Sequence, residues 1–205
     1  KFKIVLPSVV DDDRYRIYSV VVLLPDGKEI RRRMPVGAYL QVVAATNFKQ
    51  RCRKMLEYYH ADRLNYAVAG TPNRLEYDQG FFVKGGDGLA DFKPIAHLYK
   101  SQVYKMAEYL GVPAAIRARP PTTDTYSLSQ GQDEFYFSLP YAKMDLCLYA
   151  HNHGLAPESV AEALGLTPEQ VTRVFRDIEQ KRRSTRYLHI TSLLMEEVPE
   201  VHPQK

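Results

Sequence analysis

The order of apolar and polar positions predicts a short β-rich start before a series of helices. Val, Ile and Tyr are frequent in residues 2–6 and 15–24, and the turn at 25–27 separates the second run from residues 28–34. Runs of β-branched and aromatic residues bounded by proline and glycine are typical of strands joined by turns. We therefore expect a small β hairpin near the start of the chain, as an insertion or a peripheral segment.

The middle of the chain has the pattern of an α/β domain. Apolar residues recur at helical spacing over residues 36–59, with a break expected near Asn47, and again over residues 101–110. Between these helices, the apolar run 65–69 ends at Gly70 and is typical of a buried strand. This order predicts a Rossmann-like parallel sheet flanked by helices, with ligands at the carboxyl ends of its strands.

The last part of the chain is predicted to be helical after one long loop. Residues 119–132 are polar and contain two adjacent prolines, so we expect a loop, and residues 141–152 have a helical pattern. Two further helices are expected at 157–164 and 167–181, the second opening with a capping box at Thr167. The predicted organisation is a β-rich segment at 1–34, a nucleotide-binding α/β domain at 35–150 and C-terminal helices at 151–205.

Composition limits the class of protein without identifying it. The 205 residues are 45% hydrophobic and 25% charged, which is typical of a globular domain, and the net charge of +4 suits a polyanionic ligand. We expect neither a signal peptide nor a membrane partner, because no apolar run is long enough to span a bilayer. Cys52 and Cys147 are the only two cysteines and lack metal-ligand spacing, so neither a disulfide framework nor a zinc site is expected. A reducing cytoplasmic location is therefore expected.

Residues 70–91, which read GTPNRLEYDQGFFVKGGDGLAD, form the stretch richest in candidate chemistry. Glycines let a backbone approach a ligand closely, and acids among them suit a cation that accompanies phosphate. Glu76 is a candidate Mg²⁺ ligand, although the helix dipole also explains an acid in a first helical turn. Lys84, Asp87 and Asp91 either contact a ligand or belong to a solvated turn.

Other basic and hydroxyl residues are open to two interpretations. Lys100 precedes a helix and Arg51 lies within one, and each is either a phosphate contact or a solvated charge. Thr122 follows two prolines and either contacts phosphate or forms a local turn. Lys181 belongs to a basic run at a helix end, where the helix dipole alone favours cations.

Taken together, these segments resemble the NAD synthetase family of the ATP-pyrophosphatase (adenine nucleotide alpha-hydrolase-like) superfamily. The matching stretches are NFKQRCRKM at 47–55, GTPNRLE at 70–76, GFFVKGGDGLADFKPI at 80–95, LYKSQVY at 98–104 and PPTTD at 120–124. Their order and spacing make the combination specific, although each motif is modest by itself.

The resemblance implies roles for individual residues. Glu76 resembles the Mg²⁺ ligand, whereas Thr71, Lys100 and Thr122 resemble ATP contacts. The deamido-NAD contacts of the family correspond to Arg51, Lys84, Asp91 and Lys181. A histidine often precedes the last lysine in the family, and Gln180 stands there in this chain. No residue is singled out as catalytic.

The resemblance also implies a reaction. The family amidates deamido-NAD to NAD with ATP and Mg²⁺ through an adenylated intermediate, releasing AMP and pyrophosphate. Ammonia is the expected nitrogen donor, either free or derived from glutamine, and a homodimer is expected. The family's Ser-Gly-Gly-x-Asp-Ser pyrophosphate loop is not found in these residues. We therefore expect the chain to be the carboxyl part of a longer protein, with weak activity by itself.

Three alternatives compete with this interpretation. Residues 159–183 resemble a basic helix-turn-helix, which would make the protein a DNA-binding module, although we expect no nucleic-acid partner. A different ATP-pyrophosphatase-type enzyme, such as a GMP or asparagine synthetase, would share the superfamily but not the segment from Lys84 to Asp91. A non-catalytic remnant that binds nucleotides would keep the motifs without turnover.

Overall fold

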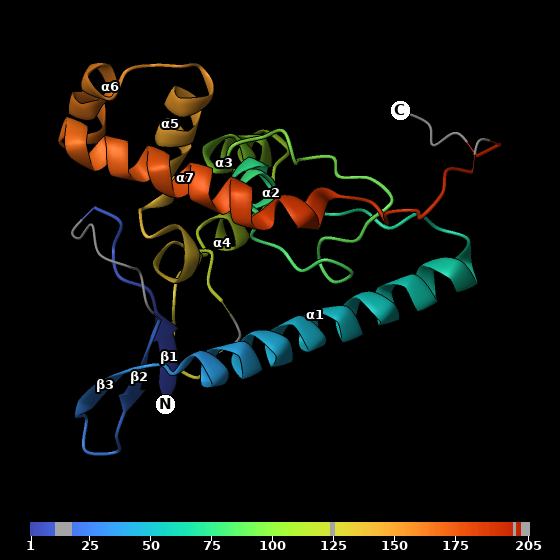
Figure 1. Ribbon diagram of the computed structural model, residues 1–205, viewed down its shortest axis with the longest axis horizontal. Coiled ribbons are helices and arrows are strands. Elements are labelled where there is room, and N and C mark those ends of the chain that lie inside the picture. Colours follow the sequence, from blue (N-terminus) through green and yellow to red (C-terminus); the bar gives the residue numbers. More distant parts are fainter. Residues whose placement is uncertain (11–17, 124–125, 199, 202–205) are drawn as a thin grey trace.

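The computed structural model describes residues 1–10, 18–123, 126–198 and 200–201, and it confirms an α/β fold in which helices predominate. The strands are β1 (Phe2–Val5), β2 (Ser19–Leu23) and β3 (Glu29–Arg33). The helical elements are α1 (Val36–Leu64), α2 (Arg74–Gln79), α3 (Lys100–Tyr109), α4 (Ala114–Arg117), the π-helical segment η1 (Asp133–Phe137), α5 (Tyr141–Asn152), α6 (Pro157–Leu164) and α7 (Pro168–His189). Figure 1 shows α1 along one side of the molecule and α7 running across the remaining helices.

The predicted hairpin is confirmed and belongs to a three-stranded antiparallel sheet. The strand order is β1-β2-β3, with β3 at one edge, and the turn between β2 and β3 includes Gly27 at a φ of 83°. The three consecutive arginines of β3 are exposed. The sheet is attached to the main domain because the Gln130 side-chain amide donates to the carbonyl of Ile4 at 2.6 Å.

The predicted parallel strand at 65–69 is present as a single parallel bridge within the described residues. Ala69 pairs with Phe92, and the N–H of Gly70 donates to the carbonyl of Phe92 at 2.8 Å. The pairing is short because Pro94 has no N–H with which to extend the ladder. The carboxyl end of this segment nevertheless leads directly into α2, as the sequence pattern requires.

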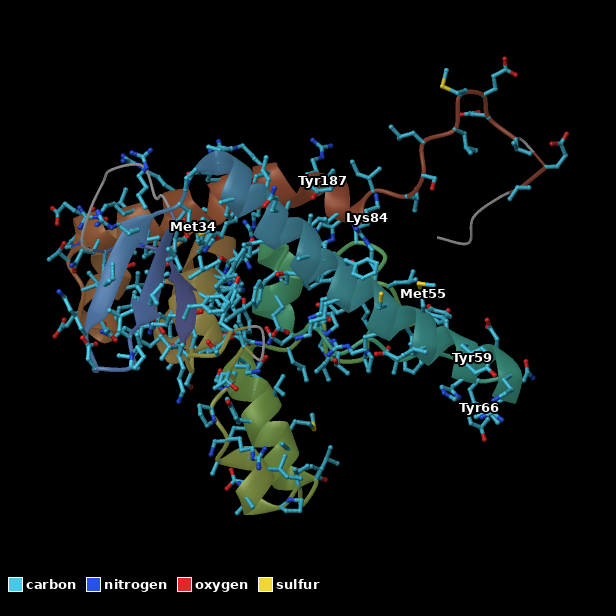
Figure 2. All side chains as sticks on the ribbon, turned by 90° about the horizontal axis from the view of Figure 1, so that it is seen from below. Met34, Met55, Tyr59, Tyr66, Lys84 and Tyr187 are labelled. Carbon is cyan, nitrogen blue, oxygen red and sulfur yellow. The ribbon has the colours of Figure 1, made fainter. Side chains whose placement is uncertain are left out.

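Helix α1 differs from the prediction in two ways. It continues without a break through Asn47, because no glycine or proline near that residue interrupts the backbone hydrogen bonds. It also contributes little to the core, since only Lys54 and Ala61 are buried. Several of its apolar residues are exposed instead, namely Leu40, Phe48, Met55, Leu56 and Tyr59, and the far end with Met55 and Tyr59 lies away from the body in Figure 2.

The hydrophobic core is formed by α2, η1, α5, α6 and α7. Its fully buried members are Leu75, Phe137, Met144, Cys147, Leu148, Val171, Val174 and Ile178. The predicted capping box is confirmed, because the hydroxyl of Thr167 accepts from the N–H of Gln170 at 3.3 Å. Helix α7 extends eight residues past its predicted end, and Lys84 bonds the carbonyls of Tyr187 in its last turn and of Ile190 just after it, as described below.

Helices α2 and α7 approach each other closely at Gly80. Gly80 ends α2 in the left-handed conformation at a φ of 71°, which glycine adopts without strain. A Cβ atom at this position would lie 2.2 Å from the Cβ of Thr185 on α7. Glycine is therefore required here for its backbone conformation and for the space beside it.

We expect Gly80→Ala to lower the free energy of unfolding by about 2–4 kcal/mol, because left-handed strain adds to overpacking against Thr185. Gly111→Ala is the matched control. Gly111 has nearly the same φ, 72°, but no atom lies within 4 Å of the position that a Cβ would occupy there, so about 1 kcal/mol of backbone strain is expected. Equal losses for the two variants in urea unfolding would show that the contact with Thr185 does not constrain the fold.

Candidate functional site

An open cavity of about 2000 Å³ lies between α1, the glycine-rich segment, the N-terminal sheet and α7. Six of the eight predicted site residues line it. They are Arg51, Thr71, Glu76, Lys84, Thr122 and Lys181. These residues come from five separate parts of the chain, so the fold brings together side chains that the sequence separates by up to 130 positions.

The other two predicted residues lie outside the cavity lining. The ammonium of Lys100 lies 5.4 Å from the ring centroid of Tyr141, and its charge acts on Glu76. The carboxylate of Asp91 accepts from the N–H of Val68 at 2.6 Å and from the hydroxyl of Tyr58 at 3.3 Å. In this structure Asp91 therefore holds the parallel bridge in place.

Glu76 has a structural role and also faces the cavity. Its carboxylate accepts from the N–H of Asn73 at 2.8 Å, while the Asn73 side chain accepts from the N–H groups of Leu75 and Glu76. This reciprocal capping box fixes the start of α2. Burial raises the pKa of Glu76, and the charge of Asp87 raises it further, whereas the bond from Asn73 and the charge of Lys100 lower it. A cation beside this carboxylate would offset the cost of burying its charge.

The loop after α2 joins α1 to the end of α7. The Asp87 carboxylate accepts from the N–H of Val83 at 2.9 Å and closes the turn, and burial raises the pKa of Asp87. The ammonium of Lys84 donates to the carbonyls of Tyr187 at 3.0 Å and Ile190 at 2.7 Å, and Figure 2 shows Lys84 beside Tyr187. Arg51 donates from its Nε to the carbonyl of Lys84 at 3.2 Å.

Lys181 is buried on the α7 side of the cavity. Its ammonium lies 2.7 Å from the carboxylate of Asp177 and 4.8 Å from the ring centroid of Tyr136. An opposite charge and an aromatic face both stabilise a buried ammonium. The lysine is therefore held as a cation at the cavity wall.

Cationic side chains outnumber acidic ones among the described residues that line the cavity. The cations are Arg33, Arg51, Arg53, Lys84, Arg173, Arg176 and Lys181, and the acids are Glu76, Asp87 and Asp177. Such a concave surface attracts polyanions. The sequence analysis missed Arg33, Arg173 and Arg176. The two α7 arginines lie three positions apart and so share one helix face, which is the signal that would have found them.

The loop at 119–132 is pinned in the described part of its length. Thr122 pairs with Gly131 in an isolated antiparallel bridge, and the N–H of Thr123 donates to the carbonyl of Gln130 at 2.9 Å. Asp124, which belongs to the PPTTD motif, lies outside the described residues. Thr122 and Thr123 both line the cavity, so this loop forms part of its wall.

A charged network on the far side of α7 holds α2 in position. The guanidinium of Arg182 makes a bidentate contact with Asp78 at 2.7 and 2.8 Å, and also bonds Glu179 at 2.9 Å. Glu179 is bonded in turn by the His151 ring at 2.7 Å, which links α5 to the network. The bonds from His151 and Arg182 lower the pKa of Glu179. Asp78 lies two residues after Glu76, so this network sets the position of Glu76 relative to α7.

The same contacts weigh against the helix-turn-helix interpretation of residues 159–183. A DNA-binding helix presents its cations to solvent, where they reach phosphate and base edges. In α7, Lys181 pairs with Asp177, Arg182 pairs with Asp78, and Arg173 donates to the carbonyl of Val10 at 2.7 Å. These three cations are used within the protein.

The described residues show neither a metal-binding cluster nor a membrane-spanning helix. These described residues contain no group of three or more His, Cys, Asp or Glu side chains arranged to hold a metal ion. None of the described helices has the length and apolar character needed to cross a bilayer. A metal at Glu76 would therefore need ligands from elsewhere, such as phosphate oxygens and water.

The fold and cavity define an α/β protein with an open cationic cavity beside the start of a short helix. The sequence model of the NAD synthase family matches residues 26–187. The chain belongs to the NAD synthase family.

Named relatives agree with this assignment. The chain is 63% identical to the NH(3)-dependent NAD(+) synthetase of Rhizobium rhizogenes over 96% of this chain and 59% of that protein. It is 62% identical to the Rhizobium meliloti protein of the same name over 97% of this chain and 60% of that protein. The chain thus spans about three fifths of the length of these relatives. Among solved structures, an NMN synthetase from Francisella tularensis superposes with a TM-score of 0.60 at 25% identity, covering 75% of this chain and 56% of that one.

We expect the contact between Asp78 and Arg182 to show strong coupling in a double-mutant cycle of Asp78→Ala and Arg182→Ala. Their side chains are 10% and 28% exposed, and the geometry is bidentate, so a coupling of about 1–3 kcal/mol is expected in urea unfolding. The exposed pair Lys105 and Glu108 on α3 is the control, with no measurable coupling expected. Additive effects of the Asp78 and Arg182 substitutions would show that the network does not position α2.

Proposed function

We propose that this chain carries the nucleotide site of an enzyme that amidates deamido-NAD to NAD at the expense of ATP. The observation that carries the proposal is the convergence on one cationic cavity of six residues to which the family resemblance assigns roles. Membership of the NAD synthase family and the names of the rhizobial relatives support it. Deamido-NAD and ATP are both polyanions, and both suit the excess of cationic side chains in this cavity.

The proposed reaction has two steps. An oxygen of the nicotinate carboxylate attacks the α-phosphorus of ATP, forming an acyl adenylate and releasing pyrophosphate. Ammonia then attacks the acyl carbon, so that a C–N bond forms, AMP leaves and NAD results. Amide formation from an acyl adenylate mainly requires positioning of the reactants and exclusion of water. No side chain of this chain is required as a covalent nucleophile.

The cations of the cavity have the task of stabilising charge on phosphate. Lys181 is held as a buried cation by Asp177, and Arg51 is fixed through the carbonyl of Lys84. Preorganised charges of this kind stabilise a transition state more than mobile charges in water do. Thr71 and Thr122 face the same space and supply hydroxyl groups for hydrogen bonds to ATP.

Mg²⁺ is the proposed cofactor, and the residues at Glu76 fit it. Glu76 is a largely buried carboxylate whose pKa is raised by burial, and one of its oxygens already accepts the bond from Asn73. Mg²⁺ is commonly bound through one or two carboxylates together with phosphate oxygens and water. When bound there, the ion would neutralise charge on the phosphates of ATP.

We also infer a homodimer that works in the cytoplasm with ammonia as its nitrogen donor. The exposed apolar residues of α1, among them Met55, Leu56 and Tyr59, favour burial against another protein surface. The rhizobial relatives carry "NH(3)-dependent" in their names, which supports free ammonia over glutamine-derived ammonia. A nucleotide-binding remnant without turnover is the competing interpretation, and the assay below separates the two.

The function is tested by incubating the full-length protein with deamido-NAD, ATP, Mg²⁺ and ammonium chloride. We expect NAD and AMP to appear in equal amounts, as measured by chromatography. Replacing ammonium chloride with glutamine distinguishes the nitrogen donors. Binding of both nucleotides without formation of NAD or AMP would support the non-catalytic remnant and contradict the proposed function.

Substitutions at Glu76 separate its two roles. Glu76→Gln retains a side chain that completes the capping box, so stability should stay near wild type while kcat/KM falls about 100-fold or more. Glu76→Ala should lose both stability and adenylation. Lys84→Ala should instead raise the KM for deamido-NAD about tenfold, through loss of a charged hydrogen bond. If both alanine variants weaken ATP binding equally in calorimetry, the assignment of separate roles is wrong.

A further inference from the structure

One end of the cavity is lined by residues outside the family motifs, among them Tyr39, Val42 and Val43 of α1. This end lies beside the N-terminal sheet and the first turns of α1, away from the glycine-rich loop. The cavity-lining residues of α1 are Tyr39, Val42, Val43, Thr46, Asn47, Gln50, Arg51 and Arg53. These positions recur at spacings of three and four, so they form one stripe along the helix.

The chemistry of this stripe changes in order along α1. It begins with an aromatic ring and two valines, continues with hydroxyl and amide groups, and ends with arginines. A nucleotide has the same order of groups, namely a planar base, a hydroxylated sugar and a charged phosphate. At 1.5 Å per residue, the stripe from Tyr39 to Arg51 is about 18 Å long, which is enough for these three groups.

Four aromatic rings form a continuous wall at the apolar end of the stripe. Tyr18, Tyr39, Tyr126 and Phe135 all line the cavity, and each is partly exposed. Tyr18 and Tyr39 are stacked with centroids 4.8 Å apart and planes 19° apart. Phe135 contacts Tyr18 at 6.3 Å and Tyr126 at 5.9 Å. The wall thus joins the N-terminal sheet, α1, the loop at 119–132 and η1.

The wall borders the hydrophobic core through Phe135, whose ring lies 6.1 Å from that of Phe81, but it is not part of the core. None of its four residues is among the buried residues of the core, whose aromatic member is Phe137. Aromatic side chains that keep exposed faces in a cavity offer a surface for stacking, and stacking accepts any planar ring.

The polar middle of the cavity contains groups whose hydrogen bonding is incomplete. The side-chain oxygen of Gln50 and the hydroxyl of Thr123 are buried and have no partner among the described residues. Both residues line the cavity. A buried acceptor without a partner is costly, and a ligand hydroxyl or amino group would satisfy it.

We propose that the wall of Tyr18, Tyr39, Tyr126 and Phe135 binds a planar heteroaromatic ring of the dinucleotide. The sugar then lies beside Gln50 and Thr123, and the phosphates lie toward Arg51 and Lys84. This subsite deepens the proposed function and rests on it. The ring is either the nicotinate or the adenine of deamido-NAD. Each of these is a flat heteroaromatic ring joined to ribose.

The test compares Tyr39→Leu and Phe135→Leu with two controls in the full-length protein. Tyr39→Phe retains the ring, and Tyr109→Leu removes an exposed tyrosine of α3 that does not line the cavity. Circular dichroism and urea unfolding check that each variant is folded. We expect both leucine variants to weaken deamido-NAD binding about tenfold in calorimetry, since stacking on an aromatic side chain contributes about 1–3 kcal/mol.

Both controls should bind deamido-NAD as the wild type does. In turnover, Tyr39→Leu should raise the KM for deamido-NAD while kcat changes little, because ring stacking contributes equally to the ground state and the transition state. A structural role alone would lower kcat and stability together. Wild-type affinity in folded Tyr39→Leu or Phe135→Leu, or an equal loss in Tyr109→Leu, would overturn the proposal.

Titration with single-ring nucleotides identifies the ring. If Tyr39→Leu weakens AMP binding but not that of nicotinate mononucleotide, adenine occupies the subsite, and the reverse result assigns it to nicotinate. An effect on neither overturns the proposal. Because these titrations need no turnover, they also test the ring subsite independently of the proposed amidation reaction. Wild-type protein that binds deamido-NAD through this wall but makes no NAD would contradict the proposed function alone.

Discussion

The close packing of Gly80 against Thr185 is the constraint on which the geometry of the site depends. It lets the end of α2 approach α7 to a distance that any side chain at position 80 would prevent. Arg182 then fixes the orientation of α2 through Asp78. Because Glu76 lies on α2 and Lys181 lies on α7, these contacts determine how a carboxylate and an ammonium face each other across the cavity. Gly80 and Thr185 are themselves part of the cavity lining, whereas Asp78 and Arg182 lie outside it.

The cavity illustrates how a protein holds like charges close together. Seven cations in one concave surface would repel each other if they were left without partners. Lys181 is stabilised by Asp177 and by the ring of Tyr136, and Lys84 is stabilised by the carbonyls at the end of α7. Both lysines are thereby fixed in place while the surface remains attractive to phosphate. The half-buried acids Glu76 and Asp87 have raised pKa values for the complementary reason, because partial burial disfavours their charged forms.

Features encoded by local chemistry were predictable from the sequence. The bounds of α5 and α6 match the prediction, and the capping box at Thr167 is present, because caps and helical spacing act over a few residues. Three of the predicted site residues that line the cavity, Thr71, Glu76 and Lys84, lie together in the glycine-rich segment, which is a local feature of the sequence. Features that depend on tertiary packing were not predictable. Arg33 and Tyr18 reach the cavity from the N-terminal sheet, and nothing in their local sequence indicates that this sheet faces α1. Asp91 was predicted as a ligand contact, but its carboxylate accepts hydrogen bonds from the N–H of Val68 and the hydroxyl of Tyr58 within the protein.

The arginines of β3 have a consequence for how copies of the protein behave together. β3 is an edge strand, and its outer side offers unpaired backbone groups to any other strand that approaches. Arg31, Arg32 and Arg33 place three positive charges along this edge. Two copies that met edge to edge would bring these charges together, and the repulsion would oppose formation of a continuous sheet. The same strand that contributes Arg33 to the cavity lining thus opposes aggregation through its exposed edge.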